Sequence, residues 1–123
     1  MNTGYSYTST TVVNNNNTAK TLGSGDMDVF ATPAMVALME NAAMKAVADH
    51  LPEGSTTVGV EISTSHLKAS AVGANVVAEA TLDEVDGRRL KFSLKAWDDA
   101  GVIGEGVHTR FIVDRERFLS KLK

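Results

Sequence analysis

The stretch from residue 32 to residue 47, TPAMVALMENAAMKAV, constrains the fold of this chain more than any other segment. Thr32 and Pro33 indicate a helix start, because a hydroxyl residue can cap the first turn and proline suits the first helical position. The helix should continue to about residue 50, where PEGS at 52–55 ends it. It is apolar almost all the way round, which predicts a core helix wrapped by other structure.

One residue breaks the apolar pattern of this helix. Glu40 has only apolar neighbours one turn away on either side. A charged carboxylate in that position is costly unless something pairs with it or uses it. Two interpretations stay open: Glu40 is satisfied by a cation or by backbone amides at a subunit contact, or it is a catalytic general base or nucleophile.

The rest of the chain alternates between apolar and polar residues with the period of β-strands. Residues 5–13 form a first predicted strand, and about four longer strands follow between residues 56 and 113. Asp86-Gly87 and DDAG at 98–101 indicate tight hairpin turns. The closing DRERFLSKLK is expected to form a short polar helix.

These elements predict an α+β fold in which a curved antiparallel sheet wraps the long helix, in a single domain of residues 1–123. A small sheet of this kind has exposed edges, so we expect a homodimer, either alone or paired into a dimer of dimers. Three strands have a face that should point inward: Val58, Val60, Ile62, Thr64 and His66; Val76, Ala78, Ala80 and Leu82; Leu90, Phe92, Leu94 and Ala96.

Composition excludes several classes of function. The net charge is −3 and the twelve Lys and Arg form no basic stripe, which argues against a nucleic-acid partner. The absence of cysteine leaves no disulfide and no thiol nucleophile, and three scattered histidines do not make a metal site. No stretch is long and apolar enough to span a membrane, and the first residues lack the pattern of a signal peptide. We therefore expect a cytoplasmic protein without a metal or cofactor.

Three side chains are candidates for chemistry. His66 shares its predicted strand face with apolar residues and should point toward the helix, where it and Glu40 would make an acid/base pair. Thr32 is either a helix cap or a ligand for a polar substrate group. Thr32 and Glu40 are roughly 12 Å apart along a continuous helix, so they share a site only with an extended substrate, a late helix start or a second subunit.

The two other histidines have less specific expectations. His50 lies at the predicted helix end, where it would cap the helix or compensate the helix dipole. His108 alternates away from the inward face that we assign to its strand, so we interpret it as peripheral.

These residues resemble those of the hotdog-fold thioesterases, in the branch similar to fluoroacetyl-CoA thioesterase. The resemblance covers nearly the whole chain and is most specific in ATPAMVALME, VGVEISTSHL and EVDGRRLKF. It implies a hotdog dimer that hydrolyses an acyl-CoA thioester at the subunit interface. It also implies that Thr32, Glu40 and His66 form the catalytic set, and that Gly59 of TVGVE lies beside the thioester carbonyl.

One feature of that branch is missing. The fluoroacetyl-specific enzyme carries phenylalanines before its threonine as a hydrophobic lid, whereas LGSGDMDV precedes Phe30 here. Fluoroacetyl specificity is therefore not expected. Lys68 and Arg110 are candidates for the CoA phosphates. The rival interpretations are a non-catalytic acyl-CoA-binding hotdog module, a structural dimerisation unit in which Glu40 and His66 satisfy each other, and a hotdog dehydratase.

Overall fold

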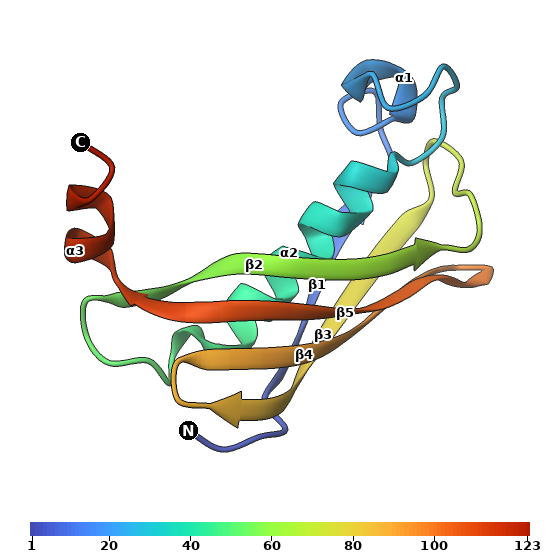
Figure 1. The fold of residues 1–123 in the computed structure, drawn as a ribbon. Helices are drawn as coiled ribbons and strands as arrows, with labels where there is room; N and C mark the ends of the chain where they lie inside the picture. Colours follow the sequence, from blue (N-terminus) through green and yellow to red (C-terminus); the bar gives the residue numbers. More distant parts are fainter.

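The computed structural model describes residues 1–123 as one antiparallel sheet with three helices (Figure 1). Along the chain the elements are β1 (Ser6–Val12), α1 (Ala19–Leu22), α2 (Thr32–Ala48), β2 (Ser55–His66), β3 (Asn75–Asp86), β4 (Arg89–Asp98), β5 (Gly101–Asp114) and α3 (Arg115–Ser120). The strand order is β1-β3-β4-β5-β2, and every neighbouring pair is antiparallel. The predicted α+β fold, with a curled sheet around one long helix, is confirmed.

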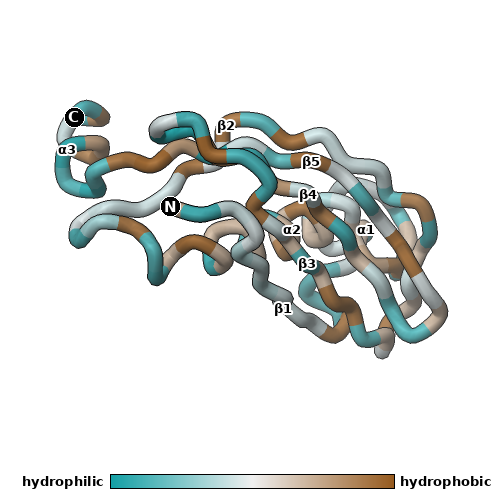
Figure 2. Tube along the Cα trace, turned by 90° about the horizontal axis from the view of Figure 1, so that it is seen from below, coloured by the Kyte–Doolittle hydropathy of each residue, from teal (hydrophilic) through white to brown (hydrophobic).

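The core forms where α2 packs against the inner face of the sheet. The alternation along β3 and β4 is as expected, because the inward side chains of both strands are buried and the intervening ones are more exposed. Figure 2 shows the hydropathy of the residues along the chain trace, in which hydrophobic and hydrophilic residues alternate in the strands. Both hairpins fall where the turn residues predict them, with Asp86 pairing with Arg89 and Asp98 with Gly101. The buried cluster includes Met35, Met39, Ala42, Ala43, Val47, Val76, Ala78, Ala80, Leu82, Leu90, Phe92, Leu94 and Ala96.

The long helix is buried on one side only. Met35 and Met39 are fully buried against the sheet, whereas Val36 and Met44 are half-exposed and the side chain of Glu40 is 40% exposed. The expectation of a helix covered on nearly every side is therefore wrong for the single chain. The uncovered face is apolar around Glu40, so it is a surface that another molecule can cover.

The face of β2 changes in the middle of the strand. Its pairing with β5 shifts between Gly59 and Glu61, which is the signature of a β-bulge. One extra residue inverts the alternation, so Val60 is 51% exposed while Ile62 packs against the core. The expectation that Val58 and Val60 share a face with His66 is wrong for that reason.

Two other features position the functional residues. β2 lies at an edge of the sheet, so the strand has no neighbour on its outer side. The segment that carries α1 folds over the beginning of α2, where short bridges join Thr18 to Phe30 and Val29 to Ala71 (Figure 1).

None of the three helices has the length and the apolar composition that a membrane span requires.

Gly106 on β5 should be intolerant of any side chain. A Cβ there would overlap the carbonyl oxygen of Ser63 and lie 2.8 Å from the Cα of Thr64. We expect Gly106→Ala to lower the free energy of unfolding by about 1–3 kcal/mol, because β2 and β5 must move apart. Urea denaturation measures this loss.

The matched control is Val107→Ala, the next residue along, whose side chain is 55% exposed. It should change stability by no more than about 0.5 kcal/mol. Equal stabilities of the two variants would contradict the close approach of β2 and β5 at Gly106.

Candidate active site

The first residue of α2 and the last residue of β2 meet at one end of the molecule. Thr32 Oγ1 and His66 Nδ1 share a hydrogen bond of 2.7 Å. Ala31, rather than Thr32, occupies the N-cap position, and no side chain caps this helix. The helix-cap interpretation of Thr32 is therefore wrong, and its hydroxyl is instead directed at the imidazole.

A cavity of about 230 Å³ adjoins this pair. Its walls come from the segment before α2 and from the loop after β2, so the covering segment and the strand end enclose it together. Its lining residues are Ala19, Ser24, Val29, Phe30, Thr32, His66, Leu67, Lys68 and Ala69. The site is thus a small pocket with five apolar lining residues, two hydroxyls, one imidazole and one amine, which suits a small acyl group with a polar end.

His66 has one ring nitrogen without a partner. Its Nε2 is buried and makes no hydrogen bond, while Nδ1 is occupied by Thr32. Partial burial lowers the pKa of His66 below its usual value, so the imidazole is neutral at pH 7. A buried polar atom left unsatisfied is costly, and a substrate or water in the adjacent cavity would satisfy it.

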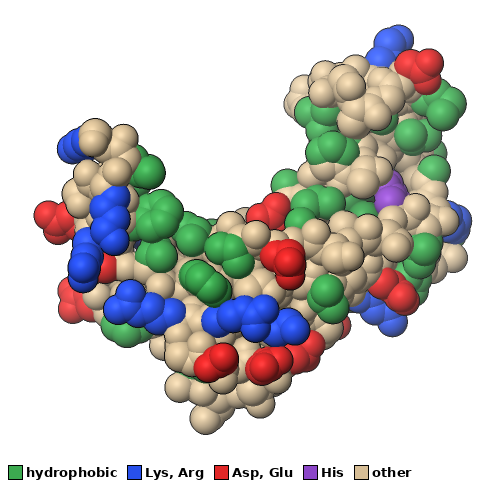
Figure 3. Space-filling model, viewed as in Figure 1, with side chains coloured by type: hydrophobic (Ala, Val, Ile, Leu, Met, Phe, Trp, Pro, Cys, Tyr) green, Lys and Arg blue, Asp and Glu red, His purple; other side chains and the backbone are tan.

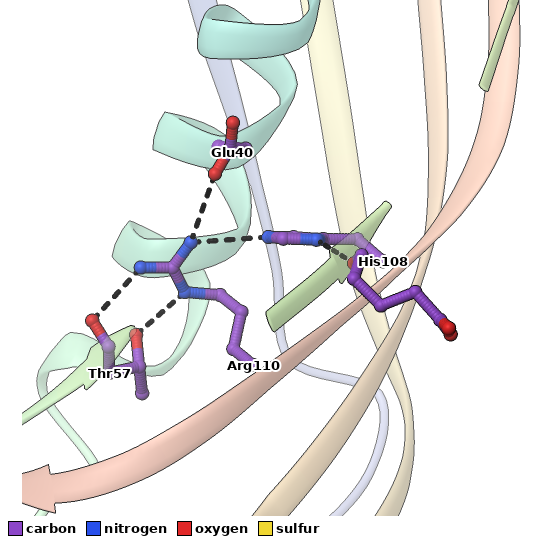
Figure 4. Close-up of polar contacts among 5 residues, drawn as sticks. Glu40, Thr57, His108 and Arg110 are labelled. Atoms are coloured by element: carbon purple, nitrogen blue, oxygen red, sulfur yellow. Dashed lines mark hydrogen bonds and ion pairs between the residues drawn. The ribbon is translucent and has the colours of Figure 1, made fainter. Parts of the chain in front are cut away.

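Glu40 lies in a different set of contacts, halfway along α2. Its Oε2 forms an ion pair with Arg110 Nη1 at 3.7 Å (Figure 4). Arg110 is buried and is held by Thr57, which accepts from Nε at 2.8 Å through its hydroxyl and from Nη2 at 2.9 Å through its carbonyl. The guanidinium is therefore fixed on the inner face of β5 and offers one edge to Glu40.

His108 supports the same guanidinium and is almost fully buried. Its Nδ1 lies 2.7 Å from the carbonyl oxygen of Glu61, which only accepts, so Nδ1 carries the proton. Its Nε2 then accepts from Arg110 Nη1 at 3.1 Å. Burial lowers the pKa of His108 and the nearby guanidinium lowers it further, which keeps the ring neutral.

Gly59 lies directly beside this network. A Cβ at Gly59 would be 3.0 Å from Glu40 Oε2 and 3.2 Å from His108 Cε1. Any other residue would therefore occupy the space next to the carboxylate. The geometry agrees with a glycine that leaves room for a small group at Glu40.

The structure brings together some of the expected site residues and separates others. Thr32 and His66 are hydrogen-bonded, and Gly59 adjoins Glu40. The expected pairing of Glu40 with His66 is wrong within one chain, because each has a different partner. Arg110 is a buried partner of Glu40 rather than an exposed phosphate ligand, whereas Lys68 does line the cavity beside His66.

His108 has a role that its sequence pattern did not indicate. His108 and Arg110 are both buried on the inner face of β5, and the interpretation of His108 as peripheral is wrong. The i, i+2 spacing of His108 and Arg110 was the available signal. His50 does not cap the helix, since Asp49 is the C-cap and the His50 ring stacks on Tyr5 at 3.6 Å. No three acidic or histidine side chains gather as a metal site.

The lowered pKa of His108 predicts a specific loss of stability in acid. The unfolded chain, with a histidine pKa of about 6.5, takes up a proton before the folded chain does. The free energy of unfolding therefore falls as the pH drops below about 6.5, toward the lower pKa of the folded state. His108→Gln should flatten this fall, measured as the urea midpoint between pH 7.5 and pH 5.5.

His66 adds to the same slope, because its pKa is lowered too. The double variant His66→Gln/His108→Gln should thus show the flattest profile. A His108→Gln profile as steep as that of the wild type would contradict a neutral, buried imidazole at position 108.

The comparisons with known proteins agree with this architecture. The model of the fluoroacetyl-CoA-specific thioesterase family matches residues 13–116. The fluoroacetyl-CoA thioesterase of Streptantibioticus cattleyicolor is 38% identical over 96 residues, which are 78% of this chain and 69% of that protein.

Solved structures extend the similarity to the whole fold. The fluoroacetyl-CoA thioesterase FlK superposes with a TM-score of 0.91 at 34% identity, covering 99% of this chain and 95% of the other. A thioesterase-superfamily protein of Thermus thermophilus gives 0.90 at 27% identity, with 98% and 90% covered. The chain therefore belongs to the fluoroacetyl-CoA-specific thioesterase family and has its hotdog fold.

Proposed function

We propose that the protein hydrolyses acyl-CoA thioesters in a site shared between two subunits, with Thr32 and His66 from one and Glu40 from the other. Membership of a thioesterase family supports the reaction, and a relative of known structure has been solved with fluoroacetate and CoA. The observation that carries the proposal is the buried, unpartnered Nε2 of His66 beside a small cavity and a hydrogen-bonded threonine.

His66 and Thr32 are suited to handle the acyl group and the leaving thiol. A neutral imidazole can take up a proton at its free Nε2, and because burial lowers the pKa of His66 the imidazolium gives that proton up again readily. In thioester hydrolysis the proton released by the reacting water, directly in the anhydride route or by way of Glu40 in the general-base route, can pass through His66 to the departing thiolate. Thr32 holds the imidazole through the 2.7 Å hydrogen bond and presents its hydroxyl to the acyl carbonyl.

Glu40 would supply the attacking group. The carboxylate either adds to the thioester carbonyl, giving an anhydride that water then opens, or removes a proton from the water that attacks. Arg110 keeps Glu40 oriented, and Gly59 leaves space beside its Oε2. In both routes the products are the free acid and CoA.

Three features support a second subunit as the source of this carboxylate. In one chain Glu40 has no contact with His66, and eight residues of helix separate it from Thr32. The face of α2 around Glu40 is apolar and uncovered. β2 is an unpaired edge, and a copy of it could add antiparallel across a two-fold axis and bring the uncovered helix faces together.

The acyl group is expected to be small. The cavity of about 230 Å³ beside Thr32 and His66 limits its size. Phe30 is buried at the wall, and the preceding GSGDMDV contributes no other phenylalanine, so we do not propose a preference for fluoroacetyl over other short acyl groups.

Release of free thiol from a panel of short acyl-CoAs tests the function. We expect turnover of at least one member, and Glu40→Gln should lower kcat by at least about 100-fold while the protein stays folded, because loss of general-base catalysis alone costs that much. Glu53→Gln is the matched control, since this exposed carboxylate lies in the loop before β2, and it should retain wild-type kcat.

Binding of acyl-CoA without thiol release would contradict hydrolysis and favour a non-catalytic binding module. Full activity of a folded Glu40→Gln variant would leave hydrolysis standing but remove Glu40 from the mechanism.

Subunit complementation tests the shared site. Glu40→Gln and His66→Ala are each expected to be inactive, yet a mixed dimer of the two holds one site with both His66 and Glu40 intact. Refolding an equimolar mixture should therefore restore about one quarter of the wild-type rate, as half of the dimers are mixed and each has one good site of two.

The control is a mixture of Thr32→Ala with His66→Ala. Both substitutions fall on the same side of the proposed site, so their mixed dimers hold no intact set. If the mixture of Glu40→Gln and His66→Ala contains mixed dimers but shows no thioesterase activity, all three residues belong to one subunit.

A further inference from the structure

Half of the basic residues of this acidic chain lie at the end of the molecule that carries α3. Six of the twelve Lys and Arg fall in residues 88–89 and 115–123, although the net charge of the whole chain is −3. Figure 3 shows Lys and Arg side chains gathered over α3 at the left of the view. The sequence separates the two groups by about 25 residues, and the fold joins them.

Three of these six basic side chains line a cavity of about 310 Å³. It lies between the turn that follows β3 and the start of α3, and six residues line it: Arg88, Val113, Asp114, Arg117, Phe118 and Lys121. Three of the six are cations and only one is an anion. The lining of the cavity thus carries a net positive charge.

None of the three cations makes an ion pair with a carboxylate of the chain. The ion pair between Arg110 and Glu40 is the only one in the structure. Asp114 uses its carboxylate to cap α3, accepting from the backbone N–H of Arg117 at 2.9 Å. Glu116 borders a neighbouring hollow with Asp114 and makes no ion pair with Arg117. Unpaired guanidinium groups around one cavity favour a ligand with several negative charges, such as phosphates.

The cavity also has an apolar wall. Phe118 and Val113 are half-buried among the cations. A flat aromatic ring can stack on a purine, while the neighbouring guanidinium and amine bind its phosphates. The combination matches a nucleotide with several phosphates better than it matches an inorganic ion.

In the proposed dimer the cavity lies closer to the active site of the opposite subunit than to that of its own chain. Ser55 at the start of β2 pairs with Asp114, whereas His66 at its end pairs with Gly104. The twelve residues of β2 span roughly 40 Å at about 3.3 Å each, so the cavity of the same chain is remote from His66. When β2 pairs antiparallel with its own copy, the first residue of one strand approaches the last residue of the other.

We propose that this α3 cavity binds the adenosine phosphates of the CoA whose acyl end lies at Thr32 and His66 of the opposite subunit. The inference rests on the proposed function, because it requires the shared dimer. It assigns Arg117 and Lys121 to the 3′-phosphate and diphosphate, with Phe118 against the adenine. CoA, rather than a carrier protein, is the form of substrate that this site takes.

Adenosine 3′,5′-bisphosphate is the probe for binding, measured by calorimetry on the whole protein. Arg117→Gln/Lys121→Gln should weaken its affinity about 10-fold or more. The same variant should raise KM for the preferred acyl-CoA to a similar extent and change kcat less than twofold. KM for the same acyl group on pantetheine, which has no phosphates, should not change.

The control variant is Lys91→Gln/Lys95→Gln on the outer face of β4. It removes the same net charge from two residues that do not line the α3 cavity, so it separates a local site from long-range attraction. This control should leave the affinity for adenosine 3′,5′-bisphosphate and both KM values within twofold of the wild type.

Several outcomes would overturn the inference. If the KM of Arg117→Gln/Lys121→Gln for acyl-CoA equals that of the wild type, the α3 cavity does not bind CoA, whereas the proposal of thioester hydrolysis is unaffected. An equal loss with the pantetheine thioester would assign the α3 end to dimer packing, and a rise in KM for an acyl carrier protein alone would assign it to a protein partner. Binding of the bisphosphate at the α3 cavity by a wild type that hydrolyses nothing would support the site and refute the enzyme.

Discussion

The structure depends on burying one face of α2 against the inside of a curled sheet. Met35 and Met39 are fully enclosed there, and the alternating side chains of β3 and β4 meet them. At about 25 cal/mol per Å² of apolar surface, this contact is the main favourable contribution to the fold. It fixes the axis of the helix, and with it the positions of Thr32 at the beginning and Glu40 on the opposite, uncovered face.

That arrangement divides the polar residues into two sites in each chain. Thr32 meets His66 where α2 begins and β2 ends, beside a small apolar cavity. Glu40 lies two turns further along, tied to Arg110, whose other hydrogen bonds go to Thr57 and His108. A buried guanidinium is tolerated only when its donors are used. The network around Arg110 therefore has a structural role as well as a role in orienting Glu40.

A two-fold dimer is a physically simple way to join these two sites. It would cover the apolar face of α2, pair the free edge of β2 and bring a carboxylate to His66. The same symmetry would bring the basic end of one chain to the acyl pocket of the other. Pairing of β2 with its copy would thus cover the open edge of the sheet and the exposed face of α2. It would also bring Glu40 of one subunit close to Thr32 of the other.

The sequence by itself determined the elements that rest on local periodicity. The extent of α2, the inward faces of β3 and β4 and both hairpin turns follow from spacing and turn chemistry, because neighbouring residues set them. Thr32, Glu40 and His66 could also be selected from the sequence as polar residues in apolar surroundings. Their partners could not.

Only the tertiary structure decided which groups meet. The bulge between Gly59 and Glu61 changes which residues of β2 point inward, and no local sequence pattern indicates the extra residue. The sequence also did not show which face of β5 points inward, so the buried position of His108 beside Arg110 could not be predicted. Thr32 looks like a helix cap in sequence but bonds to a residue 34 positions away. Contacts of that range depend on how the sheet curls round the helix, which is a property of the packed chain and not of any segment within it.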